Sequence, residues 1–117
     1  SGVMLALKSG SLAADAIIEA FRAQDFSAER FAEYSRTMRE GLENMRKLVY
    51  AFYDEGFSFR KLTDKYPDLA GDITDCLSGD VNKDFSRLYA AVAETAEVPA
   101  PLPYGAPLAE QEAEMPA

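Results

Sequence analysis

The chain has no histidine, no tryptophan and one cysteine, Cys76, among its 117 residues. Histidine and cysteine are the usual zinc ligands, so their scarcity leads us to expect no metal site. A single cysteine excludes an internal disulfide and fits the reducing cytoplasm, where we expect the protein to be located. Because no histidine is present to activate its thiol, we interpret Cys76 as a small buried apolar residue rather than a nucleophile, and no catalytic residue is predicted.

Basic residues are also scarce. Twelve lysines and arginines stand against twenty acidic residues, which gives a net charge of −8. Nucleic-acid binding requires a basic surface, so we expect no nucleic-acid partner. The longest apolar stretch, near the start, is interrupted at Lys8 and is too short to span a bilayer, and no secretory signal pattern is present. We therefore expect no membrane partner.

Sustained alternation of apolar and polar residues is absent, which predicts no β-strand. The predicted fold is all-α: a long amphipathic helix, a buried first helix, three shorter helices and an extended proline-rich tail. We divide the chain into a first helix (1–24), a helical domain (25–97) and a proline-rich acidic tail (98–117). The expected helices cover residues 3–23, 28–54, 59–65, 68–77 and 83–97, with starts at Ser27 and Ser58 and ends at Gly56 and Gly79.

The first helix is apolar around most of its circumference. Its charges form one narrow stripe, and small residues lie opposite that stripe, which favours close approach of another backbone or a flat ligand. This distribution predicts a helix buried on most sides. The stripe is Lys8, Asp15, Glu19 and Arg22, and the opposite side carries Ala6, Gly10 and Ala13, followed by Ile17.

The second helix carries apolar residues every three or four positions, the pattern of one buried face. On the other side, Arg36–Glu40, Arg39–Glu43 and Glu43–Lys47 have the spacing of ion pairs. A coiled-coil seam is the alternative interpretation. The predicted face comprises Phe31, Tyr34, Met38, Leu42, Met45, Val49 and Phe52; in the later helices Leu69, Ile73, Cys76, Leu77, Phe85, Leu88, Tyr89 and Val92 are expected to point inward.

Two further segments allow two interpretations each. Residues 80–84 (DVNKD) begin like a calcium-binding loop, but Phe85 stands where that loop requires glycine, so a helix start explains them better. The aromatic residues around Gly56 fit either a helix–helix corner in the core or the wall of an aromatic-substrate pocket. These aromatic residues are Tyr50, Phe52, Tyr53, Phe57 and Phe59.

Residues 1–18 (SGVMLALKSGSLAADAII) carry a Ser-Gly pair, an apolar helix and a Ser-Gly-x-x-Ala-Ala pattern. Ser1-Gly2 is compatible with a cloning remnant, a small helix cap, or the last turn of a glycine-rich loop that faces an anion. The whole segment resembles the flavin-dependent, tryptophan-halogenase-like halogenases and the related geranylgeranyl reductase and hydroxybenzoate hydroxylase flavoproteins.

The resemblance implies a C-terminal segment of an FAD-dependent halogenase or monooxygenase that is inactive alone. Ser1, Gly2 and Val3 would contribute backbone amides to the flavin ring or the halide. Close packing would fall to Ser9, Gly10, Ala13 and Ala14. The family's dinucleotide-binding G-x-G-x-x-G is absent here, and Lys8 does not correspond to its catalytic lysine. The implied partner is the remainder of the parent flavoenzyme, which would hold the FAD.

The alternative is a stand-alone helical protein-interaction module without catalysis. The two hypotheses differ in what covers the first helix. A module should cover it within its own monomer, whereas a segment of a larger enzyme should leave it exposed. In the second case we expect the isolated chain to self-associate through Ala6, Gly10, Ala13 and Ile17.

Overall fold

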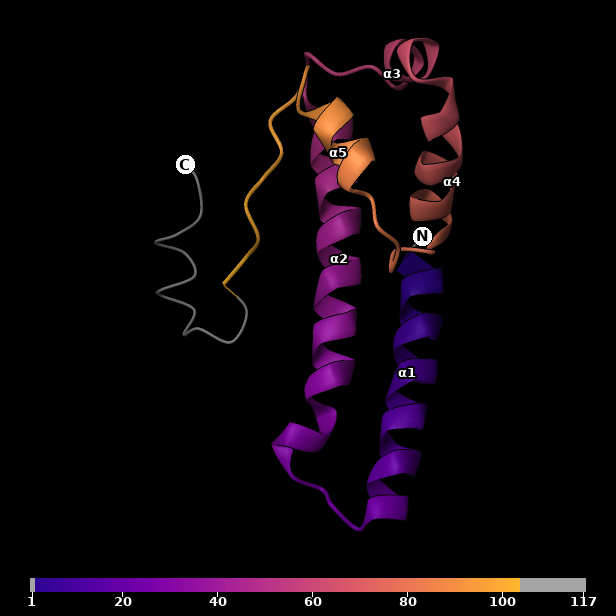
Figure 1. The fold of residues 1–117 in the computed structure, drawn as a ribbon, viewed down its shortest axis with the longest axis vertical. Coiled ribbons are helices and arrows are strands. Elements are labelled where there is room, and N and C mark those ends of the chain that lie inside the picture. Colours follow the sequence, from indigo (N-terminus) through magenta and orange to yellow (C-terminus); the bar gives the residue numbers. More distant parts are fainter. Residues whose placement is uncertain (1, 104–117) are drawn as a thin grey trace.

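The computed structural model describes residues 2–103, and within this range the chain is helical and has no strand (Figure 1). The all-α prediction is therefore confirmed, while most of the proline-rich tail lies outside the described residues. The α-helices are α1 (Gly2–Ala23), α2 (Ala32–Tyr53), α3 (Phe59–Lys65), α4 (Ala70–Ser78) and α5 (Ser86–Val92), with short 3-10 turns at Ala28–Phe31 and Pro67–Leu69.

The long helix α2 is the element against which the others are arranged (Figure 1). α1 lies antiparallel to the first half of α2, and α4 continues in line beyond the N-terminal end of α1. α5 lies beside the second half of α2, and residues 97–103 return along α2 as an extended strap. The strap and α1 thus occupy different sides of the same helix.

One apolar cluster joins the second half of α2 to α3, α4 and α5. Partly buried Leu5, Phe57, Phe59, Tyr66, Ala96 and Val98 pack against it. Cys76 is fully buried there, as predicted. The buried members are Met45, Leu48, Ala51, Leu62, Leu69, Ile73, Cys76, Val81, Phe85, Leu88, Tyr89, Ala91 and Val92.

The buried face of α2 is rotated from the predicted one. Its centre follows Gly41, Met45, Leu48 and Ala51, because the loop after α4 places Val81 directly over Gly41. The predicted positions Leu42, Val49 and Phe52 are consequently exposed. Leu77 in α4 was also expected to point inward and is 48% exposed instead.

The helix ends agree with the sequence at Ser58 and Gly79. The Ser58 side chain accepts a hydrogen bond from the Lys61 backbone, and Gly79 caps α4 with a φ of 101°. Ser27 precedes its helix as expected but makes no side-chain capping bond. The prediction that Gly56 ends the long helix is wrong: Asp54 caps it, and a Cβ on Gly56 would lie 2.7 Å from the Thr95 carbonyl oxygen.

The last helix is shorter than predicted, ending at Val92 instead of near residue 97. After Val92 the backbone closes into a turn, in which the Thr95 and Ala96 nitrogens donate to the Val92 carbonyl at 3.1 and 2.9 Å. This turn brings Thr95 against Gly56. Tertiary packing therefore fixes the end of α5.

Only one side of α1 is covered in this chain. Of residues 2–23, Ala20 alone is buried. Leu5 packs against the core, and the Ser9 and Tyr34 hydroxyls are hydrogen bonded at 3.0 Å. The expectation that the first helix is buried on most sides is therefore not met within residues 2–103.

Candidate functional site

The predicted flavin-facing residues lie at the start of α1. Ser1 falls outside the described residues, while Gly2 and Val3 form the first turn of the helix. No atom lies within 4 Å of the position of a Cβ on Gly2, and the Val3 side chain is 74% exposed. The first N–H groups of a helix have no intrahelical acceptor, so this end is free to donate hydrogen bonds to a ligand.

The side of α1 that turns away from α2 is apolar along the whole helix. We call it the α1 face. Every member is exposed, including Leu7 at 63% and Phe21 at 67%. Of the four residues predicted to lie opposite the polar stripe, the α1 face includes Ala6, Gly10 and Ile17. The fourth, Ala13, is half-buried. The α1 face comprises Val3, Ala6, Leu7, Gly10, Ala14, Ile17, Ile18 and Phe21.

A continuous apolar surface of this length is uncommon on a monomer and usually marks an interaction site. The opposite flank of α1 is polar: it borders a groove of about 410 Å³ between α1 and α2 that includes Asp15, Glu19, Arg30 and Glu33. Lys8, expected to be solvated, is half-buried. The two flanks of α1 therefore differ in chemistry.

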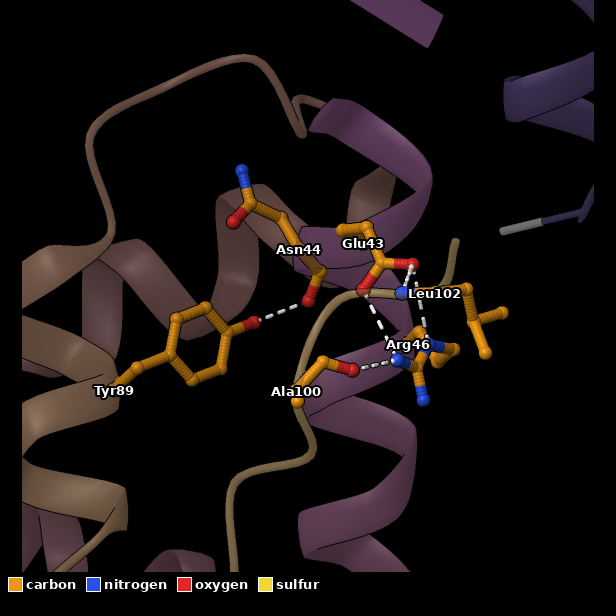
Figure 2. A network of polar contacts seen from close by, with 6 residues as sticks. All are labelled: Glu43, Asn44, Arg46, Tyr89, Ala100 and Leu102. Carbon is orange, nitrogen blue, oxygen red and sulfur yellow. Dashed lines mark hydrogen bonds and ion pairs between the residues drawn. The ribbon is translucent and has the colours of Figure 1, made fainter. Parts of the chain in front are cut away.

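A network of polar contacts holds the strap on α2 (Figure 2). Glu43 is the one buried charged residue within residues 2–103, at 8% exposure. Its carboxylate accepts from Arg46 at 3.2 Å and from the Leu102 backbone nitrogen at 3.3 Å. Arg46 also donates to the Ala100 carbonyl at 2.5 Å. Glu43 was predicted to pair with Arg39 and Lys47, and the sequence offered no signal for its contact with the strap.

An open groove of about 480 Å³ lies beside this network, between α2, the loop before α5 and the strap. Its lining mixes basic and acidic groups. Arg36 is paired with Glu40 at 3.1 Å, as predicted, and Lys83 reaches Asp72 at 3.6 Å and also Asp75. The groove is bordered by Arg36, Arg39, Glu40, Glu43, Asn44, Lys47, Lys83 and Pro101.

Cys76 and Tyr89 form a buried pair beneath α2. The Tyr89 hydroxyl donates to the Asn44 carbonyl (Figure 2), and the Cys76 sulfur lies 3.8 Å from the same carbonyl and from the Tyr89 hydroxyl. Burial raises the pKa of the Cys76 thiol above its ordinary 9.0, and burial likewise raises the pKa of Tyr89. A neutral buried thiol is a poor nucleophile, which agrees with the interpretation of Cys76 as a core residue.

Residues 80–84 form the non-helical loop before α5, which begins at Ser86 and not near Lys83 as predicted; Phe85 occupies the N-cap position and makes no side-chain capping bond. The Asp84 carboxylate accepts from the Ser86 backbone nitrogen at 2.9 Å, and its hydrogen bonds to the Ser86 side chain and backbone lower the pKa of Asp84. Lys83 is bound to Asp75. Across residues 2–103, no cluster of three or more acidic or cysteine side chains is placed to hold a metal ion.

Four of the five aromatic residues around Gly56 form two edge-to-face pairs. Phe57 and Phe59 stack edge to face at 4.8 Å and pack against the core. Phe52 and Tyr53 also stack edge to face, at 5.1 Å, but are 62% and 78% exposed. The inner pair therefore fits the helix-corner interpretation, and the outer pair leaves an aromatic surface at the end of α2.

Comparison with known proteins provides a link to halogenation. Part of this chain is similar to part of a chlorinase. The relative is 1H-pyrrole-2-carbonyl-[peptidyl-carrier protein] chlorinase of Pseudomonas fluorescens, with 35% identity over 81 residues. The match covers 69% of this chain but 18% of the chlorinase, so the chain spans less than a fifth of its relative.

No protein-family model matches the chain, and no solved structure matches it. None of the helices in residues 2–103 is long and apolar enough to cross a membrane. The chlorinase similarity agrees with the halogenase resemblance carried by residues 1–18.

Proposed function

We propose that this chain is the C-terminal segment of a cytoplasmic, FAD-dependent enzyme of the halogenase or monooxygenase type that acts on an organic substrate. The observation that carries the proposal is the exposed α1 face in a chain similar to less than a fifth of a chlorinase. A larger body that covers α1 would remove this apolar surface from water, which stabilises the assembly.

In the parent enzyme, residues 1–24 would pack on the FAD-binding part, and residues 25–97 would form a helical body beside it. Ser1, Gly2 and Val3 would direct their backbone N–H groups at the flavin ring or the halide. The position of Gly2 and Val3 in the first turn of α1 supports this role, since the N–H groups there have no intrahelical acceptor. Bound reduced FAD would supply the oxygen activation that halogenation or hydroxylation requires.

The substrate class follows from the relative, whose name specifies a pyrrole-2-carbonyl group on a peptidyl-carrier protein. We propose an acyl group held on a carrier protein as the first substrate to test. In the halogenation, dioxygen together with the reduced flavin would oxidise chloride by two electrons; the new carbon–chlorine bond would then replace a carbon–hydrogen bond, and the hydrogen would leave as a proton. Hydroxylation of the same substrate is the alternative reaction within this proposal.

The first test is to sequence the gene upstream of the Ser1 codon. A reading frame that continues upstream and encodes a strand, G-x-G-x-x-G and a helix is the expected result. The protein encoded by that frame should bind FAD and chlorinate pyrrole-2-carbonyl-carrier protein in the presence of chloride and a flavin reductant. A start codon directly before Ser1 would contradict the proposal, as would a complete protein that binds no flavin.

The site assignment is tested in that complete protein by Gly2→Pro, with Gly2→Ala as the control. Proline is tolerated at the first position of a helix but lacks the N–H group, whereas alanine retains it. We expect Gly2→Pro to lose halide-dependent turnover at least tenfold more than Gly2→Ala. Equal turnover of the two variants would show that Gly2 is not part of the site. Unchanged turnover after Ser1-Gly2→Pro-Pro would show the same for both residues.

The stand-alone module is the less favoured function. Such a module was expected to cover its first helix within the monomer, and residues 2–103 leave the α1 face exposed. A module that used the α1 face for an unrelated protein partner would bind neither FAD nor halide in any longer form of the chain. The flavin measurement above therefore separates the two functions.

A further inference from the structure

The α1 face has the spacing of a helix-pairing seam. Its central line follows residues 3, 7, 10, 14, 17 and 21, which are separated alternately by four and three positions. This alternation is the heptad pattern of helices that pack along their length. The seam extends over 18 residue steps, or about 27 Å at 1.5 Å per residue.

The sizes of the side chains along this seam are symmetric about residue 12. Small residues occupy the centre, at Gly10 and Ala14. Large apolar residues lie on both sides, with Val3 and Leu7 towards one end and Ile17 and Phe21 towards the other. If a second α1 runs antiparallel, large residues meet large ones and the two small residues meet at the centre.

We propose that the chain forms a symmetric dimer in which the α1 faces of two copies pack antiparallel, with the twofold axis near residue 12. Val3 then lies against Phe21 of the second copy, Leu7 against its Ile17, and Gly10 against its Ala14. A twofold interface must be complementary to itself, and the size order of this seam meets that requirement.

The charges of α1 do not oppose this pairing. Although the whole chain has a net charge of −8, α1 has two basic residues, Lys8 and Arg22, and two acidic ones, Asp15 and Glu19, so its net charge is zero. None of the four lies on the seam. Gly10 has no atom within 4 Å of its Cβ position, so the centre is open to the second helix.

The inference concerns the 117-residue chain by itself, without the remainder of the parent enzyme proposed above. The FAD-binding part of a longer parent would compete for the same face. The experiment is therefore made on the chain itself, and its failure is distinct from a failure to find flavin binding in the complete protein.

The first experiment measures the mass of the chain in solution by analytical ultracentrifugation, with Gly10→Phe and Gly71→Phe as matched variants. Both glycines lie in helices and have no atom within 4 Å of their Cβ position, so both variants should fold, which circular dichroism checks. We expect the unmodified chain and Gly71→Phe to be dimers. The dimer dissociation constant of Gly10→Phe should be at least tenfold higher because phenylalanine separates the helices.

The second experiment determines the orientation by crosslinking with a short bifunctional thiol reagent. Cys76 is fully buried and should not react in the folded chain. We expect a mixture of Val3→Cys and Phe21→Cys chains to give a crosslinked heterodimer, and Val3→Cys alone to give little product, because its two thiols lie at opposite ends of the seam.

Three results would overturn the proposal. If the chain is monomeric in solution, a second copy does not cover the α1 face. A dimer that Gly10→Phe leaves unchanged would place the contact on another surface, such as the exposed aromatic residues at the end of α2. Efficient crosslinking of Val3→Cys alone would show a parallel pair.

Discussion

The Leu102 backbone nitrogen donates to the Glu43 carboxylate at 3.3 Å, across 59 positions of sequence. The contact joins the strap to the one buried charged side chain within residues 2–103. Arg46 completes the arrangement by binding both the Glu43 carboxylate and the Ala100 carbonyl. A buried carboxylate requires such partners because burial removes its hydration.

Glu43→Gln should therefore release the strap and destabilise the fold. Hydrogen bonds to a charged group contribute about 1.5–3 kcal/mol each, and glutamine retains the shape but not the charge, so we expect a loss of about 1–3 kcal/mol. The control is Glu40→Gln, an exposed partner of Arg36, which should cost less than about 1 kcal/mol. Urea unfolding measures both variants, and equal losses would contradict the role of Glu43.

Gly41→Ala should destabilise the chain by about 1–3 kcal/mol, in the range for overfilling a packed site. A Cβ at this position would lie 2.6 Å from Val81 Cγ2 and 3.2 Å from Asn82 Oδ1, and Val81 is itself buried. Gly71→Ala is the matched control, since its Cβ would meet no atom within 4 Å. There alanine should stabilise the helix by up to about 1 kcal/mol. Thermal unfolding of both variants should show opposite signs.

The contribution of Glu94 to stability should depend on pH. Its carboxylate accepts from Lys65 at 2.8 Å and from the Tyr66 hydroxyl at 2.6 Å, and these bonds lower the pKa of Glu94 below its ordinary 4.5. A lowered folded-state pKa stabilises the fold above the ordinary pKa, and this contribution is lost as the pH falls through the folded-state value.

Glu94→Gln should accordingly reduce stability at neutral pH, and its difference from the unmodified chain should shrink below pH 4.5. Urea midpoints measured across that range test the expectation. Glu33→Gln, which removes an exposed carboxylate from an ion pair of 3.8 Å, is the control and should cost less stability at neutral pH. A constant Glu94→Gln difference at all pH values would contradict the proposed bonds.

The Cys76 thiol should be inert in the folded chain. It is fully buried, and burial raises its pKa, which disfavours the reactive thiolate. We expect a colorimetric disulfide reagent to react at least a hundredfold faster in denaturing urea than in buffer. Rapid labelling in buffer, with circular dichroism showing an intact fold, would contradict the burial of Cys76 beneath α2.

The sequence by itself determined which segments are helical. Periodicity located α1 and α2 to within a few residues, and Ser58 and Gly79 marked helix ends through local hydrogen bonding and a left-handed backbone. The small and apolar residues opposite the charges of α1 also identified most of the α1 face, which the structure leaves exposed. These features depend on neighbours three or four residues apart, which the order of residues fixes directly.

Only the tertiary structure decided which side of each helix is covered. The rotation of the α2 face depends on Val81 reaching Gly41, and the early end of α5 depends on Thr95 packing against Gly56. The partner of Glu43 in the strap is 59 residues away, a contact that no local spacing encodes. α1 is apolar enough to be buried on most sides, yet α2 covers only one of them. Periodicity specifies how much of a helix is apolar, whereas burial also depends on how many neighbours the fold brings to it.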